Sequence, residues 1–213
     1  MTAMEWVLAR KVIAIVRGFS PEPMLGLADA LYAGGIDLME ITFDQAKPET
    51  WKDTALAIKA IRCHMEGKML VGAGTVLTQE QLKMAADAGA KYIITPNTNP
   101  ALIRKVKDMG LVALPGAMTP SEIQAAYEAG ADAVKLFPAG NLGPTYVKAV
   151  RAPLSHIPLL GVGGITEKNA ADFLSAGCCG LGVGGNLVNK EWILAGQWSQ
   201  ITELAAEYRK VAG

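Results

Sequence analysis

Cysteine and histidine are scarce in this 213-residue sequence. The three cysteines are Cys63, Cys178 and Cys179, and the two histidines are His64 and His156. Adjacent cysteines are poorly placed to bond to each other, and an odd number of cysteines fits a reducing compartment. His64 falls inside a predicted helix and His156 before a predicted strand, so neither is placed to complete a metal site. We therefore expect no metal ion and no other cofactor.

An excess of charge of one sign is also missing, and so is a long apolar run. Lysine and arginine together number 20, as do aspartate and glutamate, and no basic cluster is interleaved with aromatic residues. This balance does not point to nucleic acid or to a membrane surface. The N-terminal segment lacks the apolar length of a secretory signal, and no window approaches the ~20 apolar residues that a membrane helix needs. We expect a cytoplasmic protein that binds neither nucleic acid nor membrane.

Hydrophobic residues make up 51% of the chain, enough for a sizeable core, and a repeated pattern of glycine divides them. Four segments begin with Ala-Gly and run into an apolar stretch. Because glycine is favoured just past the end of a helix, each Ala-Gly predicts a helix that ends and leads into a strand. The four segments are "AGGIDLMEITF" (33–43), "AGAKYIITP" (88–96), "AGADAVKLFP" (129–138) and "AGCCGLGVGG" (176–185).

Four segments of a second kind lie between them. Each runs from an apolar strand, through glycine, to a serine or threonine that is followed by an acid. The hydroxyl oxygens can accept the unpaired N–H groups of a first helical turn, so they predict helix N-caps at Ser20, Thr78, Thr119 and Thr166. The segments are "VIAIVRGFSPE" (12–22), "MLVGAGTVLTQE" (69–80), "LVALPGAMTPSE" (111–122) and "LLGVGGITEK" (159–168).

Strict alternation of the two kinds predicts eight strands, each followed by a helical stretch. Amphipathic segments such as 54–65 and 120–130 fill the intervals. This is the count for an α/β fold of the (β/α)8, or TIM-barrel, type; an open doubly wound sheet is the alternative, but a twofold alternation suits a closed ring better. No proline-rich or low-complexity linker interrupts the chain, so we expect one domain over residues 1–213, with a short helix in the first ten residues.

Chemistry in such barrels sits at the carboxyl ends of the strands. The polar residues and glycine pairs that fall there are Arg17, Glu40, Thr42, Thr75, Thr95, Asn97, Lys135, Gly163–Gly164 and Gly184–Gly185.

Lys135 stands out because it interrupts an apolar strand. Side chains alternate along a strand, so Val134 and Leu136 would face the helices while Lys135 faces the barrel axis, as does Glu40 in its own strand. A buried ion pair, or a lysine that reaches the barrel rim, is the structural alternative. Burial has a chemical use, however, because it raises the fraction of neutral amine that can attack a ketone and form an imine. Glu40 could then move protons, as in a class I aldolase.

The glycine pairs predict a phosphate site. The loops after the seventh and eighth strands of barrel enzymes commonly bind phosphate through backbone N–H groups, and Gly163, Gly164, Gly184 and Gly185 fall there. Asn186 could add a side-chain donor. Plain turn chemistry is the alternative for each pair.

Arg17 and Thr75 are candidates to hold the carboxylate of a 2-oxo acid, through charge and hydrogen bonds. A surface ion pair is the alternative for Arg17, and a turn at the end of a strand is the alternative for Thr75.

The motifs "MEITF", "VGAGTV", "VKLFPAGNLGPTYVKAV" and "GVGGI" resemble the 2-keto-3-deoxy-6-phosphogluconate (KDPG)/4-hydroxy-2-oxoglutarate (KHG) aldolases. The resemblance covers nearly the whole chain. It implies a homotrimer of (β/α)8 barrels that cleaves a 2-keto-3-deoxy sugar acid phosphate to pyruvate and glyceraldehyde 3-phosphate. The residues that it implicates are Lys135 as the Schiff-base lysine, Glu40 as the acid/base, Thr75 and Arg17 at the pyruvate end, and Pro96, Phe137 and the glycine pairs along the rest of the site.

Two positions depart from the family's pattern. Many members carry an arginine where this chain has Asp44, which leaves Arg17 to hold the carboxylate alone or makes that end bind more weakly. Many gluconate-type members have threonine where this chain has Val162, and Val162-Gly163-Gly164 looks more like the galactonate branch. A KHG aldolase, a phosphosugar isomerase or epimerase on the same fold, and a non-catalytic sugar-phosphate binder remain as alternatives.

Overall fold

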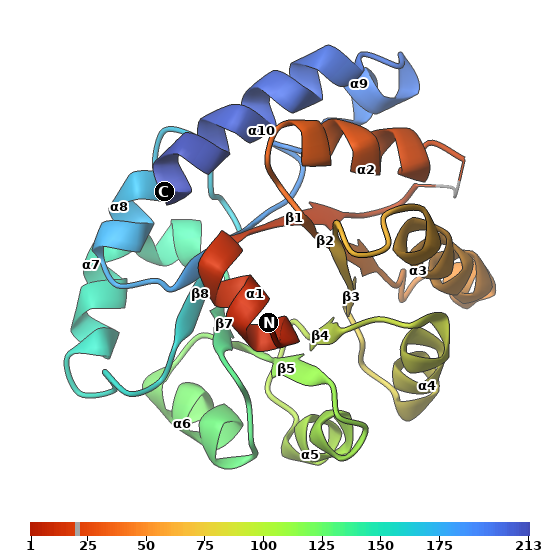
Figure 1. The fold of residues 1–213 in the computed structure, drawn as a ribbon. Helices are drawn as coiled ribbons and strands as arrows, with labels where there is room; N and C mark the ends of the chain where they lie inside the picture. The colour runs from red at the N-terminus through yellow and green to blue at the C-terminus, as the bar shows by residue number, and fades with distance from the viewer. Residues whose placement is uncertain (20–21) are drawn as a thin grey trace.

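The computed structural model describes residues 1–19 and 22–213. Figure 1 shows a ring of strands surrounded by helices, a single α/β barrel. The predicted N-cap at Ser20 lies outside the described residues. No helix in the described ranges is long and apolar enough to cross a membrane.

The predicted strands all form, and every pair of neighbours runs parallel. Their order in the sheet is β5-β4-β3-β2-β1-β9-β8-β7-β6. The strands are β1 (Val12–Val16), β2 (Leu38–Thr42), β3 (Leu70–Gly74), β4 (Tyr92–Ile94), β5 (Val112–Leu114), β6 (Gly116–Ala117), β7 (Val134–Leu136), β8 (Leu159–Val162) and β9 (Gly180–Val183).

Nine strands appear where eight are predicted, because Pro115 divides the fifth. Proline has no N–H to donate to a ladder. β5 pairs with β4 on one side of Pro115, and β6 pairs with β7 on the other. The Pro115 carbonyl accepts the backbone N–H of Lys135 at 2.8 Å, and so the ring closes beside Lys135.

Helices surround the ring. They are α1 (Ala3–Arg10), α2 (Met24–Ala33), η1 (Pro48–Thr50), α3 (Trp51–His64), α4 (Gln79–Ala88), α5 (Pro100–Asp108), α6 (Pro120–Glu128), α7 (Ala139–Arg151), α8 (Ala170–Ser175), α9 (Lys190–Leu194) and α10 (Trp198–Ala212).

Two of the predicted N-caps are confirmed and one is wrong. Thr78 and Thr119 each accept the N–H of the third helical residue, in capping boxes with Gln81 and Glu122. Thr166 does not cap a helix, because α8 begins four residues later, after Asn169. The predicted helix ends are confirmed; Gly89, for example, caps α4 with a left-handed φ of 92°.

The core has two layers. The outer layer packs strand side chains such as Val134 and Leu136 against the helices. The inner layer fills the barrel with Leu38, Tyr92, Leu160 and other alternate residues. α1 lies across one end of the ring, and its Val7 packs against the inner layer, so the predicted N-terminal helix plugs the barrel.

Candidate active site

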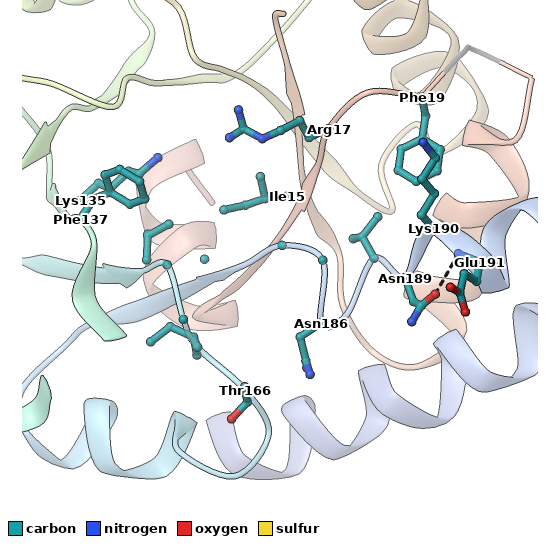
Figure 2. Close-up of a pocket in the computed structure, with 18 residues that line it drawn as sticks. Ile15, Arg17, Phe19, Lys135, Phe137, Thr166, Asn186, Asn189, Lys190 and Glu191 are labelled. Atoms are coloured by element: carbon teal, nitrogen blue, oxygen red, sulfur yellow. Dashed lines mark hydrogen bonds between the residues drawn. The ribbon is translucent and has the colours of Figure 1, made fainter. Parts of the chain in front are cut away.

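A cavity of about 720 Å³ opens where β1, β7, β8 and β9 end (Figure 2). Its wall is formed by alternate strand residues and by the loops that follow them. The predicted site residues in this wall are Arg17, Lys135, Phe137, Val162, Gly163, Gly164, Gly184, Gly185 and Asn186. The barrel topology therefore brings together nine residues that span most of the sequence.

Lys135 is the one buried lysine among the described residues, and it faces the barrel interior. Its side chain is 5% exposed, and its Nζ lies 4.9 Å from the centre of the Phe137 ring. Burial lowers the pKa of Lys135, the Glu40 carboxylate opposes that change, and the Arg17 charge adds to it. The neutral, nucleophilic form of the amine is therefore more populated than in a lysine exposed to water.

Glu40 is buried in the same barrel, on β2, and is 1% exposed. Burial raises the pKa of its carboxyl, while the charges of Lys135 and Arg17 pull it down. Oε2 is buried and finds no hydrogen-bond partner in the described part of the chain. Within those same residues Glu40 and Lys135 form no ion pair within 4.0 Å. The alternative that the two residues are a structural salt bridge is therefore not supported.

Glu40, Thr75 and Pro96 lie outside the wall of this cavity, as do Thr42, Thr95 and Asn97, the other polar candidates at the strand ends. Thr75 follows β3 with a φ of 54°, a left-handed conformation that is strained for a β-branched residue. Its carbonyl accepts Gln45 Nε2 at 2.6 Å. Pro96 is half-buried beside Gly116, the strand partner of Lys135. Glu40 still acts on the cavity through its charge on Lys135.

Arg17 is exposed at the end of β1, and Figure 2 shows its side chain directed across the mouth of the cavity. Its charge acts on both Glu40 and Lys135. Asp44, in contrast, shapes its own turn: its Oδ1 accepts the Ala46 N–H at 2.9 Å, and its carbonyl accepts Trp51 Nε1 at 2.8 Å. Arg17 is thus the guanidinium group in the cavity wall.

The two glycine loops present unused donors. The backbone N–H groups of Gly164, Ile165, Gly185 and Asn186 donate to no other group within residues 1–19 and 22–213. All four residues line the cavity. Successive free N–H groups in a loop form a concavity that suits an anion.

The side chain of Asn186 is held from outside the cavity. Figure 2 shows its side chain pointing away from Lys135 and Arg17, toward the helices. Its Oδ1 accepts the hydroxyl of Tyr208 at 2.5 Å. The amide oxygen of Asn186 is therefore engaged by Tyr208, and the predicted role of its Nδ2 as a donor to a ligand stays a prediction.

Sequence reasoning missed part of the wall. The missed residues are Ile15, Phe19, Ile165, Thr166, Gly182, Val188, Asn189, Lys190 and Glu191. Ile15 could have been found, because it pairs in register with Glu40 and shares its inward face. Phe19, Lys190 and Glu191 come from loops and helix starts, where no alternation rule fixes direction.

Among residues 1–19 and 22–213, no group of three histidine, cysteine, aspartate or glutamate side chains is arranged to hold a metal ion.

Comparisons with known proteins agree with this geometry. A family model described as KDPG and KHG aldolase matches residues 4–204. The 2-dehydro-3-deoxy-6-phosphogalactonate aldolase of Escherichia coli (strain K12) is 39% identical over 185 residues, which are 86% of this chain and 87% of that protein. A solved structure of native KDPGal has a TM-score of 0.83 and 36% identity, and the match covers 94% of this chain and 93% of the other.

A third relative captures a reaction step. KDPG aldolase from Legionella pneumophila, solved with pyruvate captured at low pH as a covalent carbinolamine intermediate, has a TM-score of 0.86 and 29% identity, covering 96% of this chain and 97% of that one. A carbinolamine is what an amine forms when it adds to a ketone. The predicted fold, family and reaction class are confirmed: the chain belongs to the KDPG and KHG aldolase family and is a class I aldolase, a carbon–carbon lyase.

Proposed function

We propose that this aldolase cleaves 2-keto-3-deoxy-6-phosphogalactonate, at least as well as its gluconate epimer, to pyruvate and glyceraldehyde 3-phosphate. The observation that carries the proposal is the buried amine of Lys135 in the cavity wall, under the influence of the Glu40 carboxylate. The names of the relatives support the substrate class, because a galactonate aldolase and a gluconate aldolase are both among them.

Lys135 is the nucleophile in this proposal. Its neutral amine adds to the C2 ketone to give a carbinolamine, and loss of water gives the imine. The imine draws electrons from the C3–C4 bond as that bond breaks. The C4 hydroxyl loses its proton, glyceraldehyde 3-phosphate leaves, and protonation at C3 followed by hydrolysis releases pyruvate and the free lysine.

Glu40 supplies and removes the protons of these steps. Dehydration of the carbinolamine needs an acid, and cleavage needs a base for the C4 hydroxyl. A carboxyl whose pKa is raised by burial, without a hydrogen-bond partner on Oε2 in the described residues, can serve in both directions.

Arg17 and Thr75 bind the carboxylate at C1. Arg17 brings the positive charge to the mouth of the cavity. Thr75 offers its hydroxyl from a strained turn, and strain of this kind is kept where the surrounding structure uses it. Phe137 lines the apolar side of the path between carboxylate and phosphate, and Pro96 supports this side from outside the cavity wall, beside Gly116.

The glycine loops bind the phosphate. The two pairs differ in a useful way: Gly163 and Gly164 have left-handed φ values of 90° and 72°, whereas Gly184 and Gly185 do not. A Cβ at Gly184 or Gly185 would meet no described heavy atom within 4 Å. Neither backbone conformation nor packing within the described chain therefore requires glycine at these two positions, and space for a ligand explains them.

Val162 biases the choice of epimer. The two substrates differ at C4, and Val162 faces inward beside the cavity at the end of β8. A threonine in this place could donate a hydrogen bond to one epimer, and valine has the same shape without the hydroxyl. One such bond is worth about 0.5–1.5 kcal/mol, a factor of roughly 2–13, which biases selection without enforcing it.

Measured kcat/KM values for both epimers test this proposal. Wild-type protein should turn over the galactonate epimer at least as efficiently as the gluconate epimer, and Val162→Thr should shift the ratio toward gluconate. Val188→Thr, at another apolar position of the same cavity wall, is the control. A strong preference of the wild type for gluconate, or an unmoved ratio in Val162→Thr, excludes Val162 as the selector. Efficient cleavage of 4-hydroxy-2-oxoglutarate with no gain from phosphate would favour the KHG reaction.

We also propose that the protein is a cytoplasmic homotrimer. The three free thiols fit a reducing compartment, and exposed apolar side chains such as Met118 and Leu194 leave surface for a second copy to cover. Light scattering on the purified protein should give three times the 22.4 kDa mass of the chain.

A further inference from the structure

We infer that Tyr208 is a positioning residue for the phosphate end of the substrate, and that its hydroxyl holds the two glycine loops in register. The inference rests on the proposal that these loops bind the phosphate group. Tyr208 is absent from the cavity wall and from every motif that the sequence singles out.

Tyr208 reaches the loops from the last helix. α10 runs along the outside of the barrel beside α8 and α2 (Figure 1). Its buried stripe is Ile201, Ala205, Tyr208 and Ala212, and Tyr208 is 0% exposed. The ring of Tyr208 packs as an apolar side chain, but its buried hydroxyl needs a hydrogen-bond partner.

The hydroxyl contacts both loops, with a short hydrogen bond to one and a longer contact to the other. It donates to Asn186 Oδ1 at 2.5 Å, and the Ile165 carbonyl lies 3.5 Å away, at the limit of hydrogen-bond distance. Ile165 directly follows the glycine pair after β8, and Asn186 directly follows the pair after β9. One buried oxygen therefore touches the residue next to each pair, and the N–H groups of those same two residues are among the free donors.

Burial keeps the hydroxyl in its donating form. It raises the pKa of Tyr208, and the Glu167 carboxylate adds to that change.

The loops need such a restraint from outside. Glycine has more conformational freedom than other residues, and donors that must be ordered when the anion arrives weaken its binding. Asn169 restrains the loop after β8, because its Nδ2 donates to the Gly164 carbonyl and its Oδ1 accepts the Thr166 N–H. Tyr208 lies between that loop and the other one: its one hydroxyl hydrogen goes to Asn186 Oδ1, and its oxygen lies 3.5 Å from the Ile165 carbonyl.

The test is Tyr208→Phe, which removes the hydroxyl and keeps the ring. KM for the phosphorylated substrate should rise about 3- to 10-fold, in line with one lost hydrogen bond, while kcat stays within about twofold. KM for the unphosphorylated analogue should not change. Tyr146→Phe is the matched control, because its hydroxyl donates to the Met118 carbonyl at 2.6 Å, away from the glycine loops.

Three outcomes would overturn the inference. An unchanged KM, as in the control, leaves Tyr208 without a role in positioning. An equal rise in KM for both substrates indicates a general structural role. If the wild type cleaves both substrates equally well, the phosphate proposal is wrong and this inference is wrong with it. If the wild type prefers the phosphorylated substrate and Tyr208→Phe has no effect, only this inference is wrong.

A second variant tests the same hydrogen bond from the other side, in case Tyr208→Phe does not fold. Asn186→Ala removes the acceptor from an exposed loop position and leaves α10 intact. It should show the same selective rise in KM for the phosphorylated substrate, and equal effects on both substrates would again contradict the inference.

Discussion

The carboxylate of Glu40 occupies the space that a side chain on Gly74 would need. The same relationship holds two residues earlier on the same face of β3, where a side chain on Gly72 would collide with the ring of Tyr92. Tyr92 is 0% exposed, and its hydroxyl donates to the Met39 carbonyl at 2.7 Å. The two glycines of β3 have no side chain on the barrel interior, and this leaves room for the buried carboxyl of Glu40 and the ring of Tyr92.

Gly74→Ala should displace Glu40 and lower turnover by at least about 10-fold, because a general acid/base must keep its distance to the substrate. The extra methyl should also cost roughly 1–3 kcal/mol of unfolding free energy, as in other overpacked cores. Gly161→Ala is the control on the outer face of β8, where the nearest atom is Cys178 Sγ at 3.3 Å. Equal turnover in the two variants would show that the position of Glu40 is not critical.

Glu40→Gln should separate activity from stability. Turnover should fall roughly 10²–10⁴-fold, the range for a lost acid/base. A carboxyl whose pKa is raised above 4.5 on folding binds its proton more tightly in the folded state, so it costs stability as the pH rises above that value. The variant lacks this cost, and its unfolding free energy relative to wild type should increase as the pH rises above 4.5.

Denaturant titrations across that pH range measure the difference, with Glu66→Gln as an exposed control. A difference that does not depend on pH would mean that Glu40 is not buried in solution. Near-normal turnover would leave Glu40 with a structural role only.

Gly184→Val should impair the phosphate end alone. The backbone conformation of Gly184 is open to other residues, and its Cβ position has no described neighbour within 4 Å, so the fold should tolerate the substitution. The new side chain would enter the cavity, and kcat/KM for the phosphorylated substrate should fall at least about 10-fold. Cleavage of the unphosphorylated analogue is the internal control, and an equal loss on both substrates would argue against a phosphate site.

The sequence predicted those parts of the fold that depend on local chemistry. Thr78 and Thr119 predict helix starts because their hydroxyls accept N–H groups of the first helical turn. Gly89 predicts a helix end because its backbone can adopt the left-handed conformation. Strand alternation gave the inward direction of Lys135 and the outward direction of Leu136.

The prediction of an N-cap at Thr166 is wrong because a second residue nearby, Asn169, takes the position before the helix. Asn169, three residues later, bonds the Thr166 N–H and the Gly164 carbonyl, and the helix starts only after it. The missed site features are non-local. The reach of Lys190 into the cavity and the contact of Tyr208 with Asn186 both depend on how distant segments meet when the ring closes.

The central claim is that substrate forms an imine on Lys135, and borohydride reduction in the presence of pyruvate tests it most directly. Mass spectrometry of the digested protein should find one reduced pyruvate adduct, on the peptide that contains Lys135, and none in Lys135→Met. Lys190 also lines the cavity and is the natural competitor, while Lys105 and Lys148 lie outside its wall. No adduct, or an adduct on any of these other lysines, would contradict the account.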